Sequence, residues 1–315
     1  MIEADGLTKY FDEFLAVDHV TFSVQPGNVL AILGPNGAGK TTTIRMLTSI
    51  LLPTSGKATV AGYDVVTHAA QVRASVGVLT EQHGLYERMR GLEYLDFFGR
   101  IYRLSSQIRL QRSQMLMDRF GLGNALDKRI GEYSKGMKQK LALVRSLLHD
   151  PPVLLLDEPT SAMDPQSAKL VRDAIKELRQ DHRTIIITTH NLTEAQLLSD
   201  RIAVIRHGRI IAQGDFDLLS TRFIGAPLME LTTTTPLNGL AKDFEALKDV
   251  ATIQEFGEDW IRYTTEDPST TNPKVLRYVM DQGAEVLTLS RVSKSLEDVY
   301  LTIVEEDEGQ EAKEK

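Results

Sequence analysis

The chain has 315 residues, of which 42% are hydrophobic and 25% are charged, a globular composition that excludes a fibre or a short peptide. Lysine plus arginine number 36 and aspartate plus glutamate number 43, which gives a net charge of −7. This charge disfavours binding to nucleic acid or anionic lipid through a broad basic surface. Because there is no cysteine, disulfides, thiolate metal sites and cysteine catalysis are excluded.

The first two thirds of the chain alternate between predicted strands and helices. Residues 1–27 carry short apolar segments closed by Pro26-Gly27, which predicts strands ending in a turn. The apolar run 29–33 predicts a strand, and 41–50 has apolar side chains at helical spacing. From about 85 to 148 the pattern is helical, which predicts a helical insertion. The alternation expected of a mostly parallel sheet then returns, with strands at 153–157 and 184–189, helices near 166–180 and 192–199, and apolar segments from 201 to 214.

A smaller second domain is expected from 221 to 304, because segments rich in serine, threonine and proline interrupt the pattern. The predicted elements are a strand at 228–232, a helix at 237–248, strands at 250–256 and 259–265, a helix at 274–282, a strand at 285–291 and a helix at 295–304. Residues 268–273 are predicted to be a loop. This order fits a small α+β domain of the split βαβ type. Residues 305–315 lack apolar side chains and predict a disordered tail.

The segment between the first buried strand and the following helix fits GxxxxGK[ST], the pattern of a phosphate-binding loop. Its glycines let successive N–H groups face phosphates, and the helix N-terminus adds partial positive charge. Lys40 neutralises phosphate oxygens, and Thr41 ligates Mg²⁺. We therefore expect a nucleoside triphosphate to bind to Gly34, Pro35, Asn36, Gly37, Ala38, Gly39, Lys40, Thr41 and Thr42.

Two adjacent carboxylates, Asp157 and Glu158, follow the buried strand at 153–156. They lie at the carboxyl end of a predicted parallel strand, where ligands bind in such sheets. Asp157 suits the role of holding Mg²⁺ through its water shell, and Glu158 suits that of a general base for the attacking water. Read alone, the pair would fit solvated acids at a strand end equally well.

On these motifs the chain resembles the ATP-binding subunits of ABC transporters, most closely the separate-chain ATPases of the type-2 exporter group, with its drug and sodium efflux systems. Walker A is GPNGAGKT at 34–41, Walker B is VLLLDE at 153–158, and the signature segment, usually LSGGQ, is YSKGM at 133–137. The resemblance covers residues 1–220. It implies a P-loop ABC ATPase domain with a mostly parallel sheet, an antiparallel β subdomain and a helical insertion. SLEDVYLTI at 295–303 is similar to a stretch near the end of such subunits.

The resemblance also assigns roles outside the phosphate loop. Ser134 and Gly136 of the signature segment would contact the γ-phosphate held by a second subunit, so that two chains sandwich two ATP molecules. Asp164 would belong to the D-loop, although Asp164-Pro165 also makes a good helix start. His190 would be the switch histidine, although a lone histidine at a strand end is more often structural. Phe11 would stack on adenine, with Tyr10 as its rival.

Two segments depart from the family pattern. The signature has Lys135 in place of a glycine and Met137 in place of glutamine. The Q-loop glutamine, which senses Mg²⁺ and the attacking water, aligns with Glu81, and Gln82 follows directly. We expect Glu81 to take this catalytic and metal-contacting role, with Gln82 as the alternative.

The function implied by the resemblance is that of an ATPase subunit, using ATP and Mg²⁺, that powers export through separate membrane permease chains. The apolar runs are far shorter than the roughly 20 residues of a membrane-spanning helix, and no secretory signal is visible. We therefore expect a cytoplasmic protein, peripheral on the inner face of the membrane, that forms a homodimer and binds no nucleic acid. The helical stretch 85–130 would receive the permease.

Two other functions remain open at this point. A soluble ABC-type ATPase that acts on ribosomes or DNA is disfavoured by the net charge and by the absence of tandem nucleotide domains or a long coiled-coil insertion. A non-hydrolysing regulatory module is favoured by Glu81 and YSKGM and opposed by Asp157, Glu158 and His190.

Overall fold

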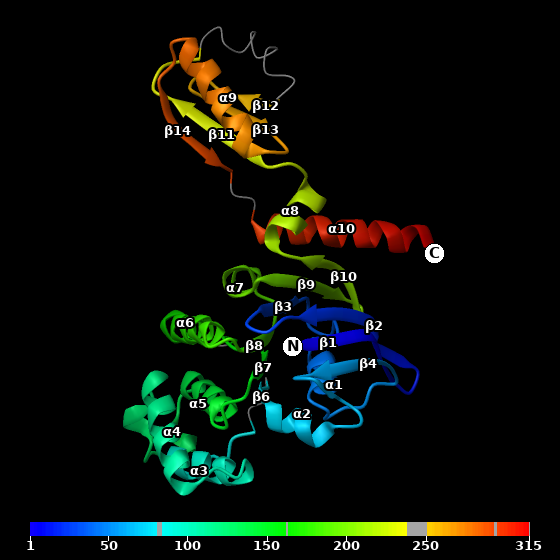
Figure 1. Cartoon of the computed structure of the whole chain (residues 1–315), viewed down its shortest axis with the longest axis vertical. Coiled ribbons are helices and arrows are strands. Elements are labelled where there is room, and N and C mark those ends of the chain that lie inside the picture. Colours follow the sequence, from blue (N-terminus) through cyan, green and yellow to red (C-terminus); the bar gives the residue numbers. More distant parts are fainter. Residues whose placement is uncertain (81–83, 162, 238–250, 293–294, 315) are drawn as a thin grey trace. The chain divides into compact units, whose positions relative to one another are not determined.

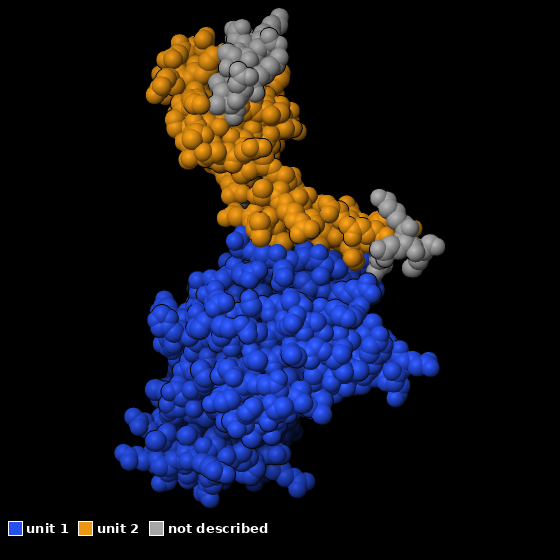
Figure 2. Space-filling view, turned by 45° about the vertical axis from the view of Figure 1, so that its right-hand side comes forward, with its two compact units in different colours: residues 1–216 blue, residues 217–315 orange. Residues whose placement is uncertain are grey.

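The chain folds into two compact units, residues 1–216 and 217–315, in the computed structural model (Figure 2). The model describes residues 1–80, 84–161, 163–237, 251–292 and 295–314. The division falls slightly before the predicted boundary at 220, because helix α8 (Phe216–Ile224) packs with the second unit from Asp217 onward.

A six-stranded sheet with the order β10-β9-β3-β8-β7-β6 forms the centre of the first unit (Figure 1). All neighbouring strands are parallel except β9 and β10, which confirms the predicted mostly parallel sheet. The strands are β3 (Val29–Leu33), β6 (Val76–Leu79), β7 (Val153–Asp157), β8 (Thr184–Thr189), β9 (Arg201–Arg206) and β10 (Arg209–Gly214).

The central strands are apolar except at their ends, and both faces of the sheet are covered. Leu154 and Leu156 of β7 belong to one core cluster, which they share with the helical insertion. Val153 and Leu155 point to the opposite face and belong to a second cluster. Side chains alternate between the two faces of the sheet along a strand. Because both faces are covered, every residue of β3, β7 and β8 is buried.

The second cluster lies between the central sheet and an antiparallel sheet of order β2-β1-β4-β5. This is the predicted antiparallel β subdomain. Its elements are β1 (Ile2–Phe11), β2 (Phe14–Val24), β4 (Ser55–Val60) and β5 (Tyr63–Asp64), and helices α1 (Lys40–Leu47) and α2 (Ala69–Ser75) contribute to the same cluster.

The predicted helical insertion is confirmed between β6 and β7. It contains α3 (Gly91–Ile101), α4 (Ser106–Arg119), the short turns η1 (Gly123–Ala125) and η2 (Ile130–Glu132), and α5 (Lys135–Leu147). Helices α6 (Pro165–Gln180) and α7 (Leu192–Leu198) follow β7 and β8. Within the described ranges, none of the helices combines the length and the apolar character that crossing a bilayer requires.

The second unit is the predicted small α+β domain, with an antiparallel sheet of order β12-β13-β11-β14. Its elements are β11 (Leu228–Thr233), β12 (Thr252–Phe256), β13 (Trp260–Thr264), α9 (Pro268–Asp281), β14 (Val286–Arg291) and α10 (Leu296–Glu314). Its own apolar core includes Leu231, Ile261, Tyr263 and Val275. Apart from Leu237, the helix predicted at 237–248 lies outside the described residues.

Two predictions for this unit are wrong. The loop expected at 268–273 is the first part of α9, because Asp267 accepts a hydrogen bond from Ser269 N (2.9 Å) and Pro268 occupies the first helical position. The tail expected to be disordered from 305 continues α10 to Glu314. That segment contains good helix formers and no proline, so a regular backbone does not require an apolar face.

A half-buried histidine, His149, connects the helical insertion to the central sheet. The ring of His149 stacks on Tyr102 with centroids 3.7 Å apart, and its Nε2 lies 3.1 Å from the carbonyl oxygen of Val76, the first residue of β6. Burial lowers the pKa of His149 to about 4. The imidazole is therefore neutral in the folded chain at neutral pH.

Acidification is expected to destabilise the fold through His149. Because the folded pKa of about 4 lies below the ordinary 6.5, the stabilisation is complete above pH 6.5 and is lost as the pH falls toward 4. The difference between these two pKa values corresponds to a loss of at most about 3.5 kcal/mol. Urea unfolding of the wild type and His149→Phe at several pH values measures it. The substitution should flatten the pH dependence over this range, and parallel curves for the two proteins would contradict the assignment.

Candidate active site

A cavity of about 550 Å³ opens at the edge of the central sheet where β3 and β7 end. Its walls come from the antiparallel subdomain, the loop before α1, the end of β7 and the residue after β8. The lining residues are Phe11, Phe14, Ala16, Asn36, Gly37, Gly39, Lys40, Thr41, Thr42, Asp157, Glu158, Ser161 and His190. Segments far apart in the sequence therefore meet at one site.

Two glycines of the loop between β3 and α1 pack too closely against backbone carbonyl groups to carry a side chain. Gly39 has a φ of +102°, and a Cβ there would lie 2.7 Å from the carbonyl oxygen of Ala16. A Cβ at Gly34 would lie 2.2 Å from the carbonyl oxygen of Ile205. These restrictions keep the loop closely packed at the start of α1, where its N–H groups are free of intrahelical partners.

The side chain of Lys40 is folded under this loop. Its Nζ donates hydrogen bonds to the carbonyl oxygens of Gly34 (2.7 Å) and Pro35 (3.1 Å), and the residue is only 6% exposed. The next residue, Thr41, donates from Oγ1 to Asp157 Oδ2 (2.8 Å). The phosphate loop and the end of β7 thus share a hydrogen bond at the cavity.

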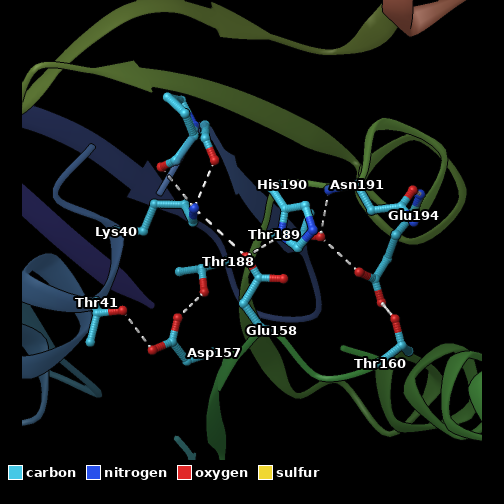
Figure 3. A network of polar contacts seen from close by, with 12 residues as sticks. Lys40, Thr41, Asp157, Glu158, Thr160, Thr188, Thr189, His190, Asn191 and Glu194 are labelled. Carbon is cyan, nitrogen blue, oxygen red and sulfur yellow. Dashed lines mark hydrogen bonds and ion pairs between the residues drawn. The ribbon is translucent and has the colours of Figure 1, made fainter. Parts of the chain in front are cut away.

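Asp157 is held from both sides and is only 2% exposed. Besides Thr41, the Thr188 hydroxyl of β8 donates to its other carboxylate oxygen (Figure 3). A carboxylate with two hydroxyl donors is fixed in orientation. The role of Thr188 was not predicted, although the threonines at the end of the run TIIITT signal polar side chains at the sheet edge.

Glu158 lies between a lysine and a histidine. Its Oε1 is 3.7 Å from Lys40 Nζ and 2.9 Å from His190 Nδ1 (Figure 3). The backbone of Glu158 has a φ of +52°, a left-handed conformation that is strained for any residue except glycine. Gln139 of α5 holds it there, since its Nε2 donates to the carbonyl oxygens of Glu158 (2.9 Å) and Pro159 (2.7 Å). No sequence pattern pointed to Gln139.

A second buried carboxylate lies behind His190. Glu194 of α7 accepts hydrogen bonds from Thr160 Oγ1 (2.6 Å) and Thr189 Oγ1 (2.8 Å). Burial raises the pKa of Glu194, the two hydroxyls act in the opposite direction, and the charge of Glu158 raises it further. The role of Glu194 was not predicted, because its two hydroxyl partners belong to different segments of the chain, one after β7 and one at the end of β8.

The adenine position has two aromatic candidates in the structure. Phe11 lines the cavity at 44% exposure, whereas Tyr10 is not among the lining residues. Phe14, at the start of β2, lines the cavity too and was not predicted. The Nζ of Lys9 lies 5.3 Å from the centroid of the Phe11 ring. Stacking of Phe11 on adenine stays a prediction.

Ser134, Gly136 and Asp164 are not among the lining residues of the cavity. Ser134 caps α5 by accepting from Met137 N (3.2 Å), and Asp164 caps α6 by accepting from Ser167 N (2.9 Å). The capping hydrogen bond lowers the pKa of Asp164. The predicted Q-loop residues Glu81 and Gln82 lie outside the described residues.

Comparison with known proteins places this chain in a family. Residues 17–161 match the family model described as ABC transporter. The chain is 41% identical over 205 residues to the ABC transporter ATP-binding protein NatA of Bacillus subtilis, a match that covers 65% of this chain and 83% of the relative. It is 34% identical over 310 residues to the daunorubicin resistance ATP-binding protein DrrA3 of Streptomyces coeruleorubidus, covering 97% and 96%.

The chain belongs to the ABC transporter family, among its ATP-binding proteins. A solved ATP-binding subunit of an ABC transporter superposes with a TM-score of 0.67 at 29% identity and covers 71% of this chain and 94% of its own. A dimeric ATP-binding cassette, determined with ADP and Pi, has a TM-score of 0.63 at 23% identity and shares the fold. Membership of this family makes the chain an ATP-binding ATPase.

Replacing Lys40 by alanine should weaken ATP binding by about 10-fold to 100-fold, because a charged donor to phosphate is worth about 1.5–3 kcal/mol. Titration with a fluorescent ATP analogue measures the affinity. Lys57→Ala, which removes an exposed lysine of β4, is the matched control. Equal ATP affinity of Lys40→Ala and the wild type would contradict the phosphate-loop assignment.

Proposed function

We propose that this ABC ATPase powers export through a separate membrane permease, by ATP-driven closure of a dimer followed by hydrolysis. The observation that carries the proposal is the position of Glu158 on the cavity, 3.7 Å from Lys40 Nζ and 2.9 Å from His190 Nδ1. A carboxylate beside a phosphate-binding lysine suits a base that acts on water at the γ-phosphate.

The residues at the end of β7 fit a Mg²⁺ ion bound together with the nucleotide. Thr41 Oγ1 and Asp157 Oδ2 lie 2.8 Å apart, and hydroxyl and carboxylate oxygens are the ligands that Mg²⁺ prefers. We assign Thr41 to the metal and Asp157 to its water shell. When bound, the ion neutralises charge that develops on the phosphates.

In the proposed reaction Glu158 accepts a proton from the attacking water. His190 orients the carboxylate of Glu158 and the water. The hydrogen bond between His190 Nδ1 and Glu158 Oε1 holds the imidazole against the carboxylate. Lys40, which is folded under the loop, provides positive charge for the phosphates. Glu81 remains the proposed Q-loop residue, with Gln82 as the alternative.

A second copy of the chain would complete this site. Ser134 is exposed at the N-terminus of α5, and neither Ser134 nor Gly136 lines the cavity of its own chain. A helix N-terminus presents free N–H donors to an anion. A C2 dimer would bring these donors to the partner's ATP at both sites, because an isologous interface uses the same surfaces twice.

The export role is supported by the relatives and by the helical insertion. The Nod factor export ATP-binding protein I of Rhizobium sp. is 34% identical over 304 residues, covering 96% of both chains. The exposed apolar side chains of Tyr86, Phe97 and Ile101 provide a surface on the insertion that suits a permease segment. Association with a permease would place the ATPase at the inner face of the membrane.

Glu158→Gln should lower steady-state phosphate release by about 100-fold or more, since general base catalysis supplies a factor of that order. The same variant should form a stable dimer with MgATP, because the nucleotide persists. Phosphate release and light scattering measure the two effects. Glu177→Gln, an exposed carboxylate paired with Arg119, is the control. A variant that keeps wild-type turnover, or stays monomeric with MgATP at every concentration, would contradict the proposal.

A further inference from the structure

Glu194 is a buried carboxylate for which the proposed reaction has no direct use. It is 3% exposed and lies in the first turn of α7. Each of its carboxylate oxygens accepts one hydrogen bond from a threonine: Oε1 from Thr160 Oγ1 (2.6 Å) and Oε2 from Thr189 Oγ1 (2.8 Å). Burying a carboxylate is costly unless it has such donors.

The two threonines belong to different catalytic segments. Thr160 comes two residues after Glu158 and directly before Ser161, which lines the cavity. Thr189 ends β8 directly before His190, which also lines the cavity. One carboxylate therefore connects the segment after β7 to the segment after β8 from behind the cavity wall, as Figure 3 shows.

Further hydrogen bonds fix the connection on the α7 side. Asn191 caps the helix by accepting from Glu194 N (3.0 Å), and its own N–H donates to Thr189 Oγ1 (3.0 Å). The hydroxyl of Thr189 is thus used twice, as a donor to Glu194 and as an acceptor from Asn191. On the β7 side, the Thr160 hydroxyl donates to the other carboxylate oxygen of Glu194.

We propose that Glu194 is a positioning residue, which holds the segments of Glu158 and His190 in register so that the 2.9 Å contact between their side chains is kept during hydrolysis. The inference rests on the proposed role of Glu158 as the base. Burial and the charge of Glu158 raise the pKa of Glu194, which fits a carboxylate placed close to the catalytic one. Small displacements of reacting groups reduce rates strongly.

Thr160→Val and Thr160→Ser form the matched test pair. Valine has the shape of threonine without the hydroxyl, so it removes the hydrogen bond to Glu194 Oε1 and leaves the phosphate loop unchanged, whereas serine keeps the donor. We expect Thr160→Val to lower kcat by about 10-fold with KM for ATP within twofold of the wild type. Thr160→Ser should restore most of kcat.

A double-mutant cycle with His190→Ala tests whether the effect passes through the histidine. If Glu194 acts by positioning His190 against Glu158, Thr160→Val should cost much less kcat in the His190→Ala background than in the wild type. Urea unfolding of every variant, in the full-length chain, shows that the comparison is made on folded protein.

The inference would be overturned if Thr160→Val kept kcat within twofold of the wild type, or if Thr160→Val and Thr160→Ser lost kcat equally. Independent effects of Thr160→Val and His190→Ala would also overturn it. Glu158→Gln separates this inference from the function on which it rests. If Glu158→Gln abolishes turnover and Thr160→Val does not change it, only the positioning role fails, whereas full turnover in Glu158→Gln removes the base itself.

Discussion

The parallel pairing of the buried strands is the constraint on which the site depends. Asp157 at the end of β7 is paired in register with Thr188 of β8, and Leu33 at the end of β3 is paired with Thr189. Since parallel strands end at the same edge of a sheet, one set of pairings aligns the phosphate loop, the two acids and the histidine. Slippage of one strand by a single residue would turn its side chains to the opposite faces.

The parts of the fold that could be predicted from the sequence are those with a local pattern. The short, continuous apolar runs of β3, β7 and β8 and the helical spacing between 85 and 148 identified the central sheet and the insertion. The strand β6 was missed, since it has four residues and includes Gly77, where a Cβ would lie 2.1 Å from the carbonyl oxygen of Ser146. A strand defined by such a close approach has no periodic signal.

The residues of the candidate site also divide into those that a local sequence pattern predicts and those that it does not. Lys40, Thr41 and the acids of β7 belong to motifs with fixed spacing, and the structure brings them together on one cavity. Gln139 and Glu194 were not predicted, because each is one of several polar residues in its helix and its hydrogen-bond partners lie on another element. Such residues become visible only when burial and hydrogen bonds are known.

The left-handed backbone of Glu158 has a consequence for how the sequence can change. A residue other than glycine pays about 1–2 kcal/mol for this conformation, so the chain would be more stable with glycine there. A substitution of Glu158 that raised thermal stability would therefore tend to remove the carboxylate. The acid at this position thus carries a backbone cost that glycine would not carry, and robustness is lower in exchange for a carboxylate on the cavity.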